Sequence, residues 1–350
     1  PGTLIAAAMT NFVVALIVIV IARDVGEDQI AVPDVIDVRT ADHTAAALRD
    51  PLLPRALLLI AGGTAVASFI YEIAWIRMLS LVLGSATHAF ELMLSAFILG
   101  LASGALWLRT RADSFRDPVR TLGIVQWTMG VMALATIPIY LASFEWTADL
   151  LRALSRTEEA YRTFNVVRYA VCLVVMLPAT FCAGMTLPLI TRTLMTIGGG
   201  ERAIGAVYAI NTLGSIIGAA TAGLLLLPLL GVKGTLIFGG AMDMALGVWL
   251  VYRYRGAILG GTRLLRITAI GSAAIVVNMV FTQEFDRGVL SSGVYRYGVA
   301  PAVGSRPVDF YRDGRTATVS LRTDASGSKS LATNGKPDAS LTKEWMQAPV

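Results

Sequence analysis

A small set of ionisable side chains lies within or at the start of long apolar segments, where an isolated charge is costly. The set comprises Glu72, Arg77, His88, Glu91 and Asp243. An ionisable group at membrane depth is expected to face the interior of a helical bundle and to have a partner there. Each residue is therefore a candidate for a functional site inside a membrane.

The structural alternative is an internal ion pair that holds helices together. Glu72 has two candidate partners for such a pair, Arg77 and Arg168. For Asp243, a packing or hydrogen-bonding role is favoured, because an internal repeat described below places Asn11 opposite it. The residue types alone leave both interpretations open.

The two cysteines, Cys172 and Cys182, lie in one apolar segment. Ten residues of helix separate their Cα atoms by about 15 Å, which is beyond disulfide reach. Neither has a histidine at ligand spacing. We therefore predict no structural disulfide and no metal site.

The composition predicts that most of the surface faces lipid. Of the 350 residues, 55% are hydrophobic and 15% are charged, and the mean hydropathy is +0.66. Soluble domains carry about 25% charged residues. The pI of 9.4 does not indicate nucleic-acid binding, because basic residues that flank membrane spans explain it.

Several apolar segments reach, or nearly reach, the roughly 20 residues that cross a bilayer as a helix. They are 3–22, 56–83, 87–108, 121–143, 166–190, 204–230, 234–252 and 267–283. The last is interrupted by Asn278, and its alternative is a helix lying in the membrane interface. Residues 145–165 have apolar residues at helical spacing among charges, which predicts a short amphipathic helix on the bilayer surface.

These segments divide the chain into four parts. Residues 1–22 are the last helix of a preceding membrane repeat, 23–54 a cytoplasmic linker, 55–283 a bundle of about seven helices, and 284–350 the start of a water-facing domain. The positive-inside rule places 23–54 and the arginine-rich loops in the cytoplasm. These loops are 109–120, 191–203 and 253–266. GLASG at 100–104 and GSIIG at 214–218 have the small-residue spacing of close helix packing.

An internal repeat relates the first apolar segment to a later one. Pro1-Gly-Thr-Leu-Ile and the run to Val20 align without a gap with Lys233-Gly-Thr-Leu-Ile and the run to Tyr252. The repeat implies a bundle of two halves with about twelve helices, the construction of transporters of the major facilitator type. The predicted fold class is thus mainly α. It comprises a polytopic transmembrane bundle corresponding to a major-facilitator-like half, followed by the β-hairpin start of a truncated α/β domain.

Polar residues and glycine–proline punctuation return after residue 284. TATVSLRT and KSLATNG predict two strands joined by the turn Asp324-Ala-Ser-Gly-Ser, which is a β-hairpin pattern.

Strings along most of the chain resemble one family, the bacterial fused membrane proteins that join a major-facilitator-like bundle to a spermidine-synthase-like domain. They are YEIAWIRMLSLVLGS (71–85), AFILGLASG (96–104), AGMTLPLITR (183–192), YAINTLGSIIGAATAGLLLLPLLG (208–231), LSSGVYRYG (290–298), FYRDGRTATVSL (310–321) and NGKPDAS (334–340). The resemblance implies a multi-pass protein of the bacterial inner membrane.

The resemblance also implies an aminopropyltransferase activity on a polyamine, with decarboxylated S-adenosylmethionine as cofactor. The nucleotide loop and the catalytic residues of such a domain are expected after Val350. By position, Asp338 and Gln347 are the candidates that approach a substrate amine. NGKPDAS and WMQ depart from the DGxxQ and Tyr-His-Glu motifs of soluble aminopropyltransferases, and a plain Asn-Gly hairpin turn is the alternative.

A second class of function is a transporter or binding protein whose soluble domain is not catalytic. The two classes differ over residues 267–283. If this segment spans the membrane, the following domain lies outside the cytoplasm, away from S-adenosylmethionine. If it is interfacial, the domain is cytoplasmic and the enzymatic interpretation gains.

Overall fold

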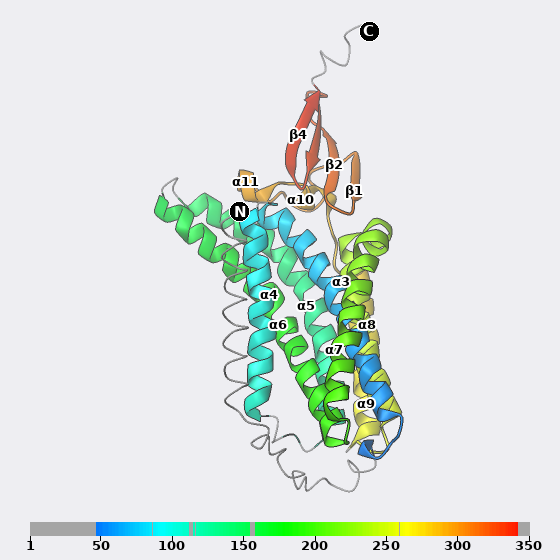
Figure 1. The fold of residues 1–350 in the computed structure, drawn as a ribbon. Helices are drawn as coiled ribbons and strands as arrows, with labels where there is room; N and C mark the ends of the chain where they lie inside the picture. The colour runs from blue at the N-terminus through cyan, green and yellow to red at the C-terminus, as the bar shows by residue number, and fades with distance from the viewer. Residues whose placement is uncertain are drawn as a thin grey trace. The chain divides into compact units, whose positions relative to one another are not determined.

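The computed structural model describes residues 47–85, 87–111, 115, 117–154, 158–258 and 260–341. The predictions for 1–22, for the internal repeat, for most of the linker and for Gln347 lie outside these residues. The described part is mainly helical and ends in a small antiparallel sheet (Figure 1).

The helices follow one another in an up-and-down arrangement. They are α3 (Leu53–Leu83), α4 (Thr87–Arg111), α5 (Pro118–Ala153), α6 (Glu158–Thr196), α7 (Gly200–Thr221), the π-helical η3 (Ala222–Leu226), α8 (Leu227–Arg253) and α9 (Gly261–Phe281). Among the described residues, six helical stretches are long and apolar enough to cross a membrane. The apolar segments predicted between 56 and 252 all lie within these stretches.

One of the six stretches, Gly200–Arg253, reverses direction at Gly231. Gly231 has φ 68° and ψ −178°, a conformation that glycine adopts without a steric penalty. Contacts with α3 give the two directions. They are Gly62–Ile210 and Val66–Gly218 for α7, and Gly63–Leu246 and Tyr71–Gly239 for α8. The separate segments predicted at 204–230 and 234–252 are therefore two antiparallel legs.

The amphipathic surface helix predicted over 145–165 is wrong as a separate element. Residues 145–153 continue α5, and residues 158–165 form the first turns of α6. Glu145, Asp149, Arg152 and Arg162 lie on helical ends that extend past the apolar segments.

Helix α9 runs lengthwise along the bundle. Its first half contacts α5, where the Trp127 indole N–H donates to Thr268 O at 3.1 Å and to Ser272 Oγ at 2.9 Å. At the other end, Lys233 Nζ at the start of the second leg donates to Val280 O at 2.9 Å. Helix α9 is thus antiparallel to the second leg of α8, which favours the spanning alternative for 267–283 over the interfacial one.

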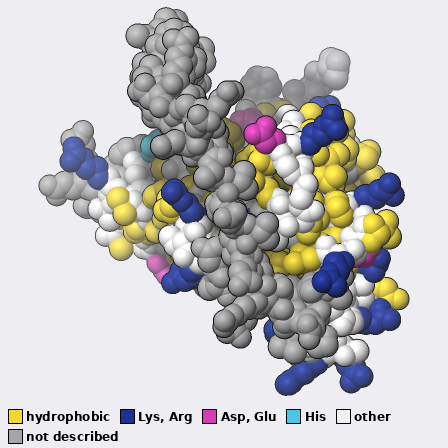
Figure 2. Space-filling view, turned by 60° about the horizontal axis from the view of Figure 1, so that its bottom comes forward, with side chains coloured by type: hydrophobic (Ala, Val, Ile, Leu, Met, Phe, Trp, Pro, Cys, Tyr) yellow, Lys and Arg dark blue, Asp and Glu magenta, His cyan; other side chains and the backbone are white. Residues whose placement is uncertain are grey.

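The loops predicted to be cytoplasmic gather at one end of the bundle. Asp50 before α3 forms a 2.7 Å ion pair with Arg253 at the end of α8, and the ends of α4 and α6 share a buried cluster with them. The described arginines of this end are Arg49, Arg55, Arg109, Arg111, Arg120, Arg192, Arg202, Arg253, Arg255, Arg263 and Arg266. Figure 2 shows Lys and Arg side chains distributed around this end.

Glycines allow the close helix packing that their spacing predicted. A Cβ added at Gly104 would overlap the Phe181 carbonyl group on α6. One added at Gly218 would overlap the Val66 carbonyl group on α3. The packing role predicted for GLASG and GSIIG is confirmed.

The C-terminal region forms two short helices and a four-stranded antiparallel sheet in sequence order. Its elements are α10 (Arg287–Leu290), α11 (Val294–Tyr297), β1 (Phe310–Asp313), β2 (Thr318–Thr323), β3 (Lys329–Thr333) and β4 (Lys336–Leu341). The hairpin predicted around Asp324 is confirmed, since β2 and β3 pair with Thr323 opposite Lys329. Asn334 and Gly335, with φ 49° and 75°, form the tight turn between β3 and β4.

Candidate functional site

A buried polar network lies inside the bundle around Asp243. Tyr71 Oη on α3 donates to Asp243 Oδ2 at 2.6 Å, and Gln126 Nε2 on α5 donates to Oδ1. Thr64 Oγ1 donates in turn to Gln126 Oε1 at 2.8 Å. The network thus joins α3, α5 and α8.

The prediction that Asp243 faces the interior with a partner is confirmed. Its partners are neutral hydrogen-bond donors, and among the described residues it has no ion pair. Buried polar groups require such partners, because an unpaired one keeps its full desolvation cost. Polar Gln126 in the apolar segment 121–143 was the available sequence signal for this site, although its spacing from Asp243 is uninformative.

Glu72 lies half-buried on α3 without a hydrogen-bond or ion-pair partner among the described residues. The ion-pair alternative with Arg77 or Arg168 is therefore not found among the described residues. Both arginines are engaged elsewhere, because Arg168 Nη2 donates to Leu83 O at 2.6 Å, at the end of α3, and Arg77 contacts the sheet. Glu72 remains a candidate functional residue.

His88 and Glu91 lie on the first turn of α4, outside the interior of the bundle. Their side chains are 49% and 65% exposed, and Nδ1 of His88 lies 3.3 Å from Oε2 of Glu91. They pair with each other across one helical turn. The structure thus separates them from Asp243 and Glu72.

Arg77 joins the bundle to the sheet. Its side chain is only 6% exposed, near the end of α3. Nη1 donates to Thr316 O at 2.6 Å, and Nη2 donates to Thr318 Oγ1 at 3.1 Å on β2. A buried guanidinium needs such acceptors, so the sheet supplies what Glu72 was expected to supply.

Asp313 connects the sheet to a second part of the bundle. Thr318 Oγ1 donates to Asp313 Oδ1 at 2.7 Å. The Val232 N–H donates to Asp313 Oδ2 at 3.2 Å. Because Val232 is the first residue of the leg that follows Gly231, the carboxylate caps a helix N-terminus whose dipole favours a negative charge.

A close contact between two glycines also holds the sheet against the segment before α11. A Cβ on Gly335 would lie 2.7 Å from the backbone N of Gly293, so the turn after β3 fits closely against the segment before α11. Asn334 Oδ1 accepts from the Thr318 N–H at 2.9 Å. The Asn-Gly turn predicted as the alternative for NGKPDAS is therefore present and has a structural role.

Asp338 is exposed on β4 and falls in a β-bulge. Leu331 pairs with Ala339 and Ala332 pairs with Pro337, which leaves Asp338 without an opposite residue. Tyr295 lies within its electrostatic range. Burial is the main cause of the raised pKa of Tyr295, and the negative charge of Asp338 raises this pKa further.

The described residues do not fit a nucleotide cofactor such as decarboxylated S-adenosylmethionine. Their strands form an antiparallel meander, and none of them leads through a glycine-rich loop into a helix whose N-terminus binds phosphate or ribose. They also hold no cluster of three or more potential metal ligands.

Comparisons with known proteins add no relative to this picture. No family model, no curated protein and no solved structure matches the chain. The described structure contains two features that are candidates for a function, the buried network at Asp243 and the junction of Arg77 with Asp313.

Proposed function

We propose that this protein is a multi-pass protein of the bacterial inner membrane, whose bundle holds the first sheet of a spermidine-synthase-like, polyamine-binding domain. The supporting observation is where the resembling strings lie in space. Arg77, Gly231, Asp313 and Thr318 belong to three of those strings and lie at the junction, and Gly293 and Gly335, from two further strings, contact each other within the C-terminal region. Three of the resembling strings, far apart in the sequence, thus meet at one structural feature, and this supports the proposal.

The activity proposed for such a domain is aminopropyl transfer to a polyamine amine. Within the described residues, the exposed Asp338 is the candidate carboxylate for that cationic substrate. The donor would be bound by other residues, since those described do not fit it. The contribution proposed for the described chain is therefore to place the sheet and to receive the amine.

A transporter or binding protein with a non-catalytic domain is the second candidate, and the direction of α9 favours it. Helix α9 begins at the arginine-rich end and leads to the sheet at the other end (Figure 1). Under the positive-inside rule, the sheet then lies outside the cytoplasm, away from a supply of decarboxylated S-adenosylmethionine. The buried Asp243 and the unpaired Glu72 are the groups that such a protein would use.

The side of the membrane on which the sheet lies distinguishes the transferase from the transporter or binding protein. A cysteine replaces exposed Lys329 in a background without Cys172 and Cys182, and intact cells are treated with a membrane-impermeant thiol reagent. Gly256→Cys is the matched control, because nothing lies within 4 Å of its Cβ position and it belongs to the arginine-rich end. Labelling at 329 with protection at 256 supports the transporter or binding protein. Protection at 329 until lysis supports the transferase.

Binding and turnover test polyamine recognition itself. The purified full-length protein is titrated with spermidine, and then incubated with spermidine and decarboxylated S-adenosylmethionine. Aminopropylated product supports the transferase, and spermidine binding without product supports the binding protein. Asp338→Asn is expected to weaken spermidine binding, and Asp309→Asn, just before β1, is the control. Absence of both binding and turnover would overturn the polyamine proposal.

A further inference from the structure

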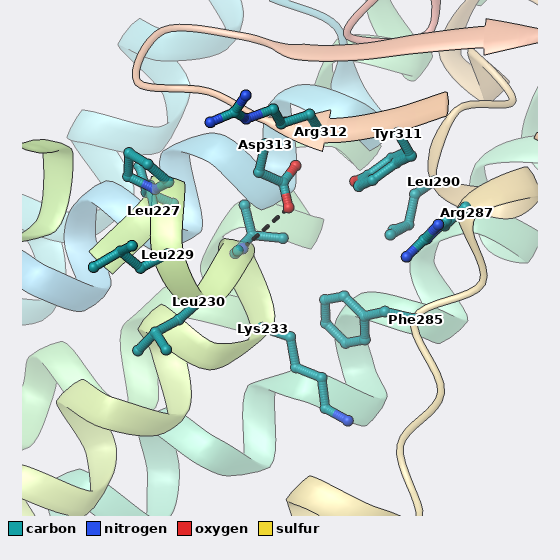
Figure 3. A pocket seen from close by; sticks show the side chains of 13 residues that line it. Leu227, Leu229, Leu230, Lys233, Phe285, Arg287, Leu290, Tyr311, Arg312 and Asp313 are labelled. Carbon is teal, nitrogen blue, oxygen red and sulfur yellow. Dashed lines mark hydrogen bonds between the residues drawn. The ribbon is translucent and has the colours of Figure 1, made fainter. Parts of the chain in front are cut away.

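An open pocket of about 370 Å³ lies where the bundle meets the sheet. Figure 3 shows Leu227, Leu229 and Leu230 on one side and Tyr311, Leu290, Arg287 and Phe285 on the other. Asp313 lies between the two sides and accepts from the Val232 N–H. The pocket thus combines residues of α8, α10, β1 and the segment after α9.

The pocket lining carries more positive than negative charge. Lys233, Arg287 and Arg312 line it, and Asp313 is its one acidic residue. Both oxygens of Asp313 already accept hydrogen bonds, from Thr318 Oγ1 and from the Val232 N–H. The acid therefore serves the junction, and it is not paired with the basic side chains of the pocket.

The three basic residues have different roles. Lys233 Nζ donates to Val280 O at 2.9 Å and to Gln283 O at 2.6 Å, which holds the end of α9. Arg287 and Arg312 are exposed, and neither has a hydrogen bond or an ion pair from its guanidinium to another described residue. In Figure 3 the Arg287 side chain extends into the opening beside Phe285.

The other side of the pocket is apolar and open to the surroundings of the bundle. Leu229 is 75% exposed and Leu230 is 50% exposed at the top of the reversal at Gly231. These leucines end an apolar helical stretch that is long enough to cross a membrane. For a first leg that spans a membrane, this end of the leg places the pocket near the level where hydrocarbon gives way to head groups.

From this geometry we infer a binding site for the head group of an anionic phospholipid. Arg287 binds the lipid phosphate, Lys233 and Arg312 add positive potential, and an acyl chain packs on Leu229 and Leu230. Guanidinium and phosphate form strong charge-assisted hydrogen bonds, and basic sites near a membrane surface attract anionic lipids. A bound lipid contacts α8, α10 and β1 together, so it stabilises the docked sheet.

The site is independent of the polyamine proposal, since it uses neither Asp338 nor a cationic ligand. A free phosphate ion offers the same charge but no acyl chain for Leu229 and Leu230. Phosphatidylglycerol and inorganic phosphate are therefore the two probes that distinguish a lipid ligand from a free phosphate ion. Phosphatidylcholine tests whether the lipid needs a net negative charge.

The test measures the thermal stability of the full-length protein in uncharged detergent while each probe is added. Phosphatidylglycerol is expected to raise the midpoint of unfolding saturably, whereas phosphatidylcholine and inorganic phosphate leave it unchanged. Arg287→Gln should weaken the apparent affinity for phosphatidylglycerol about tenfold, which corresponds to losing one charge-assisted contact. Arg306→Gln, elsewhere in the same region, is the matched control and should bind as the wild type does.

Native mass spectrometry of the same samples gives a second readout that does not depend on stability. Wild-type protein should retain phosphatidylglycerol, and Arg287→Gln should retain less, with Arg287→Lys in between. Equal stabilisation by inorganic phosphate would overturn the lipid proposal in favour of a soluble anion. Equal binding by Arg287→Gln and wild type would overturn the pocket as the site.

Discussion

Arg77 Nη2 on α3 donates to Thr318 Oγ1 on β2 at 3.1 Å, and so joins residues that are 241 positions apart. Thr318 Oγ1 in turn donates to Asp313, whose carboxylate caps the helical leg that begins at Val232. One polar chain therefore connects the end of α3, the sheet and the reversal at Gly231. Buried and partly buried hydrogen bonds therefore fix the sheet to the bundle.

Removal of the Arg77 guanidinium should destabilise the docked sheet. Arg77→Met keeps the length of the side chain but leaves Thr316 O and Thr318 Oγ1 without their donor. Hydrogen bonds to a charged group contribute about 1.5–3 kcal/mol, so we expect a loss in that range and faster hydrogen exchange in β1–β3. Arg55→Gln, exposed on the same helix, should change neither quantity. Unchanged exchange in Arg77→Met would show that the junction does not hold the sheet.

Replacement of Asp243 should separate its hydrogen-bonding role from its charge. Asp243→Ala leaves the buried donors of Tyr71 and Gln126 unpaired, at a cost of about 1–3 kcal/mol each. Asp243→Asn keeps an acceptor for Tyr71, so thermal unfolding of the purified protein should show a smaller loss. Asp149→Ala, exposed on α5, is the control. Equal losses for the Ala and Asn variants would show that the negative charge itself is needed for stability.

The close contact of α3 with α7 should be sensitive to a single methyl group. Gly218→Ala places a Cβ against the Val66 backbone, which cannot move away as a side chain can. Overpacking of this kind costs about 1–3 kcal/mol, measurable as a lower unfolding midpoint. Gly223→Ala is the matched control, because nothing lies within 4 Å of its Cβ position. A comparable loss in both variants would assign the effect to helix propensity instead of packing.

The turn between β2 and β3 should lose stability in acid. Hydrogen bonds from Ser326 and Ser328 lower the pKa of Asp324 below its ordinary value. A lowered folded-state pKa gives stability that is present above the unfolded-state pKa and is lost as the pH falls through the folded-state value. The wild type should therefore lose stability relative to Asp324→Asn as the pH falls below about 4.

Hydrogen exchange of residues 324–328, corrected for intrinsic rates, measures this effect at the turn itself. The Asn variant retains a side-chain acceptor but does not titrate, so its protection should be nearly constant over this pH range. Parallel pH profiles for the two proteins would contradict the contribution of the Asp324 carboxylate.

The sequence alone determined that the chain forms a helical bundle and where its apolar segments lie. Apolar segments of membrane length between 56 and 252 predicted the helices, because desolvation of the backbone favours helix wherever water is absent. Local turn chemistry likewise predicted the hairpin at Asp324, and small-residue spacing predicted the contacts of Gly104 and Gly218. Each of these features depends on residues that are close together in the sequence, so the local pattern of residue types predicts it directly.

Contacts between distant segments were decided only by the tertiary structure. The sequence suggested Glu72 as the partner of Arg77, whereas the structure gives it Thr316 and Thr318 on a sheet that lies far along the chain. It also predicted a surface helix over 145–165, where the helices simply continue. Which donor meets which acceptor depends on how the legs pack and where Gly231 reverses the chain. Spacing within a single segment carries no information about that.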